Sequence, residues 1–222
     1  MQHWCARFAG ARGVTACCLT GVFVRSEPGT LQIAFLTGQS DLASCALSAE
    51  QQAFLQQLRG TGRHCVTCNY PYRHDSAAHR RMPLWRASLS NARQYLAARN
   101  ARVAAADRAR VHALLEQAPM TLLLAGSCGL QLLSALQLPD ALRARLAVFA
   151  YGPVCHAPAA FGRLRVVQGR SDWISHALFD GQVHARPACG HMAYLRNAEV
   201  LAECQRLLVQ IERMQPDTTH AH

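Results

Sequence analysis

The sequence predicts an α/β fold in which a mostly parallel central sheet carries helices on both faces. Short apolar runs alternate with helix-like segments along the chain, as strands and helices do in such folds. The 222 residues with 50% hydrophobic content suffice for one core around a sheet that is covered on both sides. We therefore expect a single domain over residues 1–214, followed by a frayed tail over residues 215–222.

The elements of the first half follow from apolar runs and local turn signals. Pro28 and Gly29 mark a turn, after which Leu31–Leu36 is the clearest early strand. Ser48 and Gln51 have the spacing of a capping box, which predicts the start of a helix. The first half is expected to contain strands at 3–9, 14–25, 31–36 and 65–69 and helices at 48–58, 77–99 and 101–117.

The second half alternates more regularly. An apolar run ends just before Ser127 and leads into a helix-like segment, and a later run ends at Gly152 and Pro153. The C-terminal part is amphipathic with helical periodicity. Strands are expected at 121–126, 146–151, 164–169 and 182–188, and a final helix at 198–214.

The segment Thr121–Leu133, TLLLAGSCGLQLL, contains the first candidate for chemistry. It predicts a strand, a sharp turn and a helix, with Ser127 at the turn. Ala125 and Gly129 lie two residues away on each side, and small residues are needed there because the two backbones pass close together. An ordinary strand-to-helix turn is the alternative interpretation of this segment on its own.

Two later loops supply a carboxylate and an imidazole. Asp172 lies just after the predicted strand Leu164–Gly169, and His191 lies just after the last predicted strand. A serine hydroxyl becomes a good nucleophile only when a base removes its proton, and a carboxylate keeps that base in the productive tautomer. The expected roles are nucleophile for Ser127, base for His191 and orienting acid for Asp172, with Asp180 and Asp140 as alternative acids.

The turn around Ser127, the chain order Ser127, Asp172, His191 and the Gly-His pair after the last strand resemble the α/β-hydrolase superfamily. The nucleophile turn of that family is usually written G-x-S-x-G, and Ala125 stands here in place of the first glycine. The resemblance implies a serine esterase or thioesterase with a Ser-Asp-His triad. It also implies an oxyanion hole built from the backbone N–H groups of Cys128 and Gln39, with Thr37-Gly38 in place of the usual His-Gly pair.

Many members of that superfamily carry a lid between the strand after the nucleophile and the strand before the acid. Here the gap Val154–Arg163 is too short for one, so we expect a small lidless enzyme without a separate cap domain. The segment 70–118 is the remaining candidate to cover the site. Its candidate substrate-binding residues are Tyr70, Tyr72 and Trp85, together with Gly38 from the oxyanion loop, although an aromatic cluster is also typical of a core.

The basic residues of the chain are all arginines, and they are concentrated in segment 70–118. This segment holds nine arginines against three acidic residues, within a chain whose formal net charge is +10. An arginine-rich face beside an acyl site suits an acidic carrier protein or the phosphates of coenzyme A. A base composition that favours arginine codons is the alternative explanation. We expect no nucleic-acid partner, because the segment contains no motif that reads a groove or stacks bases.

The ten cysteines favour buried, reduced thiols rather than disulfides, since most occupy positions where small hydrophobic residues would serve. Cys65 and Cys68 have the spacing of a redox or metal pair, but no second pair or histidine cluster accompanies them. We therefore expect no metal and no cofactor. No apolar run approaches the length of a membrane span and the N-terminus does not resemble a signal peptide, so we expect a cytoplasmic protein.

The sequence thus predicts a hydrolase of an ester or thioester whose acyl group is carried on acyl carrier protein or coenzyme A. Three alternatives stay open: a generic small-molecule carboxylesterase, an acyltransferase, and a binding protein that keeps the fold without turnover. The departures at Ala125 and Thr37 motivate the last of these.

Overall fold

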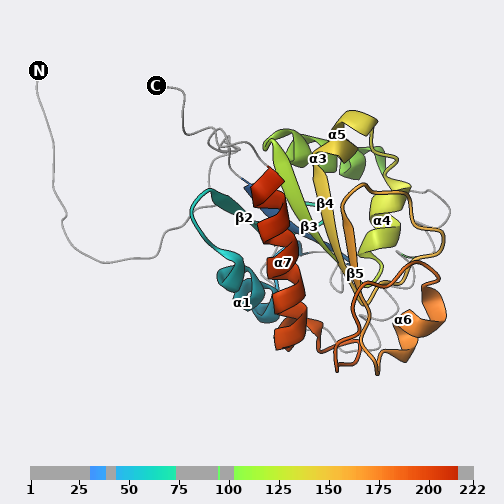
Figure 1. The fold of residues 1–222 in the computed structure, drawn as a ribbon. Coiled ribbons are helices and arrows are strands. Elements are labelled where there is room, and N and C mark those ends of the chain that lie inside the picture. Colours follow the sequence, from blue (N-terminus) through green and yellow to red (C-terminus); the bar gives the residue numbers. More distant parts are fainter. Residues whose placement is uncertain (1–30, 39–43, 74–94, 96–102, 215–222) are drawn as a thin grey trace, which may run out of the picture.

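The structure is a computed structural model that describes residues 31–38, 44–73, 95 and 103–214. These residues form an α/β fold around a five-stranded, all-parallel sheet of order β2-β1-β3-β4-β5 (Figure 1). The strands are β1 (Leu31–Thr37), β2 (Arg63–Asn69), β3 (Met120–Gly126), β4 (Leu146–Tyr151) and β5 (Leu164–Val167). The helices are α1 (Ala49–Leu58), α3 (Ala105–Glu116), α4 (Gly129–Ala135), α5 (Asp140–Ala144), α6 (Trp173–Leu178) and α7 (Ala198–Met214), with a short 3-10 helix, η1 (Tyr194–Arg196).

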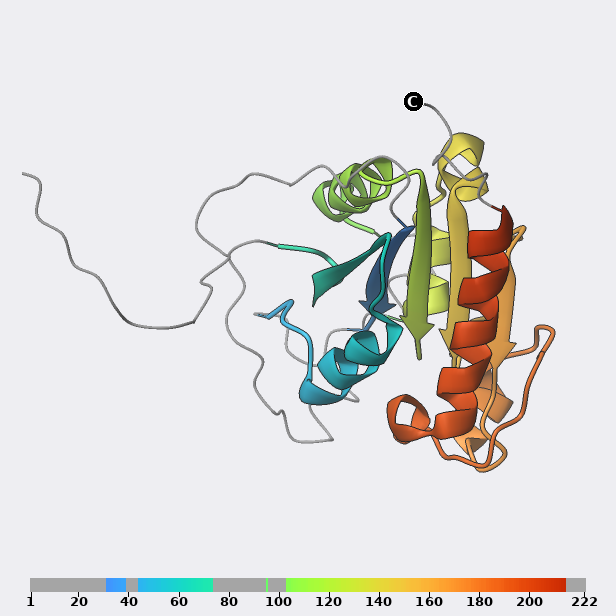
Figure 2. The same cartoon turned by 60° about the vertical axis from the view of Figure 1, so that its left-hand side comes forward.

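Helices cover both faces of the sheet, as the sequence predicts. Helices α1 and α7 lie on one face, and α3, α4 and α5 pack against the other (Figure 2). The alternation of side chains along β1 separates the two layers: Ile33 and Phe35 pack with α1 and α7, whereas Ala34 and Leu36 pack with α3 and α4. All four side chains are fully buried, so the sheet is the centre of two apolar cores.

Several predicted elements are confirmed almost to the residue. The Ser48 side chain accepts the Gln51 N–H at 3.2 Å and the Gln51 side chain accepts the Ser48 N–H at 2.9 Å, which is the predicted capping box at the start of α1. The predicted strands at 31–36, 65–69, 121–126, 146–151 and 164–169 and the helix at 198–214 all occur, within two residues at each end. The helix predicted at 101–117 begins at Ala105.

Some predictions fall on residues that the structure does not describe. These are the two opening strands at 3–9 and 14–25, nearly all of the helix at 77–99, and the tail at 215–222. The gap Val154–Arg163 is described and contains no helix.

The strand predicted at Gln182–Ala188 is wrong. This segment runs beside β5 but forms only an isolated bridge, between Ala185 and Val167. The side chain of His184 accepts the Val166 N–H at 3.1 Å, where a neighbouring strand would offer a backbone carbonyl. Pro187 has no N–H to extend a ladder. The alternating pattern therefore marks an extended edge segment and not a sixth strand.

Candidate active site

The structure places Ser127 at a strained turn directly after β3. Its φ of +52° is unusual for a residue with a side chain. The turn is held from both sides, because the Ser127 N–H donates to the Tyr151 carbonyl at 3.2 Å and the Ser127 carbonyl accepts the Val154 N–H at 2.9 Å. The end of β4 thus fixes the backbone of the serine, as a nucleophile turn requires.

The close approach of neighbouring backbones explains the small residues on either side of Ser127. A Cβ atom added to Gly129 would lie 1.9 Å from the carbonyl oxygen of Leu36 at the end of β1, so only glycine fits where α4 begins. Ala125 is fully buried and pairs with Leu36 and Ala150 in the neighbouring strands. The strand accommodates its methyl group, so the departure from G-x-S-x-G leaves the turn intact.

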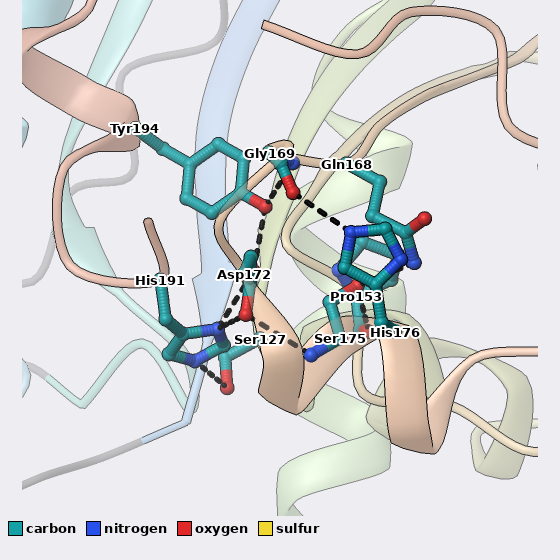
Figure 3. Close-up of polar contacts among 9 residues, drawn as sticks. All are labelled: Ser127, Pro153, Gln168, Gly169, Asp172, Ser175, His176, His191 and Tyr194. Carbon is teal, nitrogen blue, oxygen red and sulfur yellow. Dashed lines mark hydrogen bonds and ion pairs between the residues drawn. The ribbon is translucent and has the colours of Figure 1, made fainter. Parts of the chain in front are cut away.

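Ser127, His191 and Asp172 form a continuous chain of polar contacts (Figure 3). The Ser127 Oγ lies 3.3 Å from His191 Nε2, and His191 Nδ1 lies 3.0 and 2.9 Å from the two carboxylate oxygens of Asp172. Because the strands are parallel, the loops after β3 and β5 emerge at the same sheet edge, and His191 returns to that edge from the segment beside β5. The three residues are brought together as the sequence predicts.

Asp172 is held by several donors besides the histidine. It is the N-cap of α6, where Oδ1 accepts the Ser175 N–H at 3.0 Å, and Oδ2 accepts the Tyr194 hydroxyl at 2.6 Å. The carboxylate is fully buried. Burial raises the pKa of Asp172, but the hydrogen bonds from His191, Tyr194 and the Ser175 N–H outweigh it and hold the pKa below its usual value. The residue therefore stays ionised beside the imidazole at neutral pH.

The alternative acids lie elsewhere. Asp140 pairs with Arg143 in the first turn of α5, and Asp180 lies 3.4 Å from His156. Asp172 is the carboxylate that contacts His191.

The two expected oxyanion donors are the backbone N–H groups of Cys128 and Gln39. Cys128 is the N-cap of α4, directly after Ser127, and its thiol is buried beside the backbone of Gly38. Burial raises the pKa of this thiol to about 12, although backbone groups of Cys128 and Gly38 oppose the rise. The thiol is therefore a packing group, and the contribution of Cys128 would come from its N–H. Gln39 lies outside the described residues.

A polar clamp holds the end of β1, which leads to Gly38. The Asn69 side chain accepts the Thr37 N–H at 3.0 Å and donates to Thr37 Oγ1 at 2.7 Å. These bonds continue the contact of β1 with β2 beyond the last paired residues, Phe35 and Asn69, through a side chain. The Thr37-Gly38 pair is thus fixed in the absence of the usual histidine.

The candidate substrate-binding tyrosines are buried. Tyr72 donates its hydroxyl to the Phe35 carbonyl at 2.7 Å, and Tyr70 packs edge-to-face on Tyr72. Burial, followed by the neighbouring Asp107 carboxylate, raises the pKa of Tyr70 well above its usual value. Their contacts are those of core residues, and their role toward a substrate stays a prediction. Trp85 and most of segment 70–118 lie outside the described residues.

The Cys65 and Cys68 pair does not form a joint site. Cys65 packs against the layer of α1 and α7, whereas Cys68 packs against the layer of α3 and α4. Residues three positions apart in a strand point to opposite faces. Among the described residues, no group of three or more His, Cys, Asp or Glu side chains is arranged to hold a metal ion.

Sequence reasoning missed the residues that support the acid. Ser175 and Tyr194 both donate to Asp172, and Gly152 leaves the space in which Tyr194 meets the Asp172 carboxylate. Tyr194 had a local signal, because it lies three residues after His191 and was the nearest tyrosine to a predicted triad member. Ser175 and Gly152 had none, since one acts through its backbone N–H and the other through the lack of a side chain.

No helix in the described part of the chain is both long and apolar enough to span a membrane. The chain matches none of the protein-family models, and no curated protein matches it either. The resemblance to α/β-hydrolases therefore rests on the residues described above, carried by a five-stranded parallel α/β fold.

Proposed function

We propose that this protein is a serine hydrolase that cleaves an ester or a thioester through an acyl-enzyme. The observation that carries the proposal is the contact chain from Ser127 Oγ through His191 to the buried Asp172, with the serine on a turn at positive φ. A serine or histidine that served only to pack the core would not require this chain of contacts or a strained turn. A serine hydroxyl becomes a good nucleophile when a base removes its proton and a carboxylate orients that base, and these are the residue types present here.

In the first half-reaction, Ser127 Oγ attacks the acyl carbon while its proton passes to His191 Nε2. The imidazolium is stabilised by Asp172, which accepts from Nδ1 and stays ionised. The tetrahedral intermediate collapses when His191 returns the proton to the leaving alcohol or thiol, so that the acyl group remains on Ser127. Water, deprotonated by the same histidine, then releases the acid and restores the serine.

Negative charge develops on the carbonyl oxygen in both half-reactions. The Cys128 N–H, at the start of α4, is the proposed first donor to this oxyanion, and the Gln39 N–H is the expected second donor. Removing one such donor costs an enzyme about a hundred- to a thousandfold in rate. Substitution of the Cys128 side chain should leave the rate nearly unchanged, because the proposed donor is the backbone.

The proposed substrate class is an acyl thioester or ester carried on acyl carrier protein or coenzyme A. Support comes from the sequence, in the arginine-rich segment 70–118. Hydrolysis of acyl carrier protein thioesters, coenzyme A thioesters and simple esters, compared at equal concentrations, tests this assignment. A preference for simple esters that ionic strength does not affect would favour the carboxylesterase alternative.

A fluorophosphonate tests the chemistry itself, because it reacts with activated serines. Intact and peptide masses should show one adduct, on Ser127 of the wild type, that is absent in Ser127→Ala and His191→Ala. Ser134→Ala is a matched serine control on α4 and should keep the adduct. A folded wild-type protein that gains no adduct would overturn the proposal, and a binding protein on this fold would then be the better interpretation.

A further inference from the structure

Tyr194 lies outside the proposed triad and contacts two of its members. Its hydroxyl donates to Asp172 Oδ2 at 2.6 Å, and its ring packs edge-to-face on the ring of His191 at 6.5 Å between centroids (Figure 3). The same hydroxyl accepts the Gly169 N–H at 2.6 Å. One side chain thus connects the backbone just after β5 to the carboxylate that faces the histidine.

Burial makes this contact strong. Asp172 is 0% and Tyr194 2% exposed, so water has little access to replace the hydroxyl if it is lost. A short hydrogen bond to an ionised acceptor contributes more than one between neutral groups. Burial, followed by the Asp172 carboxylate, raises the pKa of Tyr194 well above its usual value, so the hydroxyl keeps its proton and stays a donor at neutral pH.

Gly152 leaves room for the contact between Tyr194 and Asp172. A Cβ atom added to Gly152 would lie 2.5 Å from the Tyr194 ring and 2.9 Å from Asp172 Oδ2. Gly152 also has a φ of +52°, which glycine adopts without strain. On another side, the ring of Tyr151 lies 5.8 Å from that of Tyr194. The tyrosine is therefore confined between the end of β4 and the acid.

Building on the proposed hydrolase function, we propose that Tyr194 is a positioning residue that fixes the carboxylate of Asp172 against His191. The Ser175 N–H holds Oδ1, and the Tyr194 hydroxyl holds Oδ2. Two oxygens fixed from two elements define the plane of the carboxylate, whereas one would allow it to rotate. Tyr194 acts through Asp172 and the histidine, and not on the substrate.

The test is a double-mutant cycle on the rate of fluorophosphonate labelling at Ser127. It compares wild type, Tyr194→Phe, Asp172→Asn and the double variant. Phenylalanine keeps the ring and removes the hydroxyl. We expect Tyr194→Phe to lower the maximal labelling rate about tenfold, the size of one hydrogen bond to a charged group, with the half-saturating reagent concentration unchanged. In the Asp172→Asn background the same change should have almost no further effect.

A merely structural tyrosine would behave differently. Loss of packing or stability would lower the rate by the same factor in both backgrounds, and that outcome would overturn the inference. Ser134→Ala is the matched control, because the Ser134 hydroxyl, like that of Tyr194, donates one hydrogen bond and accepts a backbone N–H. It donates to the Leu130 carbonyl at 2.9 Å and accepts the Ala159 N–H at 3.1 Å. It should lower the melting temperature without slowing the labelling.

Two further outcomes keep the two proposals apart. A labelled wild type with an equally fast Tyr194→Phe variant would refute the role of Tyr194 and leave the hydrolase proposal standing. An unlabelled, folded wild type would refute both. If Tyr194→Phe does not fold, Gly152→Ala displaces the same contact from the other side, and it should slow labelling in the wild-type background but not in Asp172→Asn.

Discussion

Gly129 offers the sharpest test of the nucleophile turn. In Gly129→Ala the new methyl carbon would lie 1.9 Å from the Leu36 carbonyl oxygen, and ordinary contacts of this kind exceed 3.0 Å. The Leu36 oxygen belongs to the backbone and the position of a Cβ is fixed by its own backbone, so no side-chain rotation relieves the contact. The start of α4 and the end of β1 must move apart by about 1 Å, and Ser127 lies two residues before the helix position that moves.

The magnitude follows from this displacement. Overpacking of a well-packed core costs about 1–3 kcal/mol, which in a domain of this size lowers the melting temperature by about 3–10 °C. A misplacement of about 1 Å at a reacting group can cost about a hundredfold in rate. We therefore expect Gly129→Ala to lose about two orders of magnitude in fluorophosphonate labelling while still folding.

The assay pairs the melting temperature with the rate of labelling at Ser127. The control is Gly162→Ala, because a Cβ at Gly162 would meet no atom within 4 Å. This variant should match the wild type in both measurements. If Gly129→Ala also matched it in both, the close approach of α4 to Leu36 would be refuted, and with it the physical reason given for a small residue at this position.

Three further predictions concern charge, reactivity and stability. Because folding lowers the pKa of Asp172, this carboxylate stabilises the native state above its unfolded pKa of about 3.9, and the stabilisation is lost as the pH falls through the lower folded pKa. Asp172→Asn should therefore flatten the fall in melting temperature below about pH 5, and it should slow labelling about ten-thousandfold. The Cys128 thiol, with 1% exposure and a pKa raised to about 12, should resist iodoacetamide in the native protein at neutral pH and react after unfolding in urea; native alkylation would contradict its placement. The Arg63 guanidinium donates to both carboxylate oxygens of Glu212, at 2.6 and 3.0 Å, and the pair is only partly exposed, so Glu212→Gln should lower the urea midpoint by the equivalent of about 1 kcal/mol.

Local signals made much of the fold predictable. The capping box at Ser48 needs only residues three apart, and the short apolar runs before Ser127 and at Leu146–Tyr151, each bounded by a turn signal, are buried strands. The edge of the sheet was harder, because an alternating pattern such as Gln182–Ala188 also suits a half-exposed segment beside β5. The segment does not pair as a strand because the His184 side chain accepts the Val166 N–H and Pro187 has no N–H to donate. The alternating pattern discloses neither effect.

The candidate site was also predictable only in part. Chain order predicted Ser127, Asp172 and His191, because the loops after parallel strands share one edge. The support of Asp172 by Tyr194 and by the space at Gly152 depends on three-dimensional packing between segments that have no common pattern in the sequence. The burial of Tyr72 against Phe35 is likewise a property of packing, which an aromatic-rich segment does not disclose.

Asp172 has two separate roles, as a helix cap and as the partner of His191. As the N-cap of α6 it needs a short side chain that accepts the Ser175 N–H, a need that asparagine, serine or threonine would also meet. As the partner of His191 it needs a negative charge, which only the carboxylate provides. A single-base change from Asp to Asn would therefore keep the cap of the helix and remove the charge on which the proposed hydrolysis depends. Under the proposed function, descendants of such a chain would keep the same architecture whether or not they still turned over a substrate.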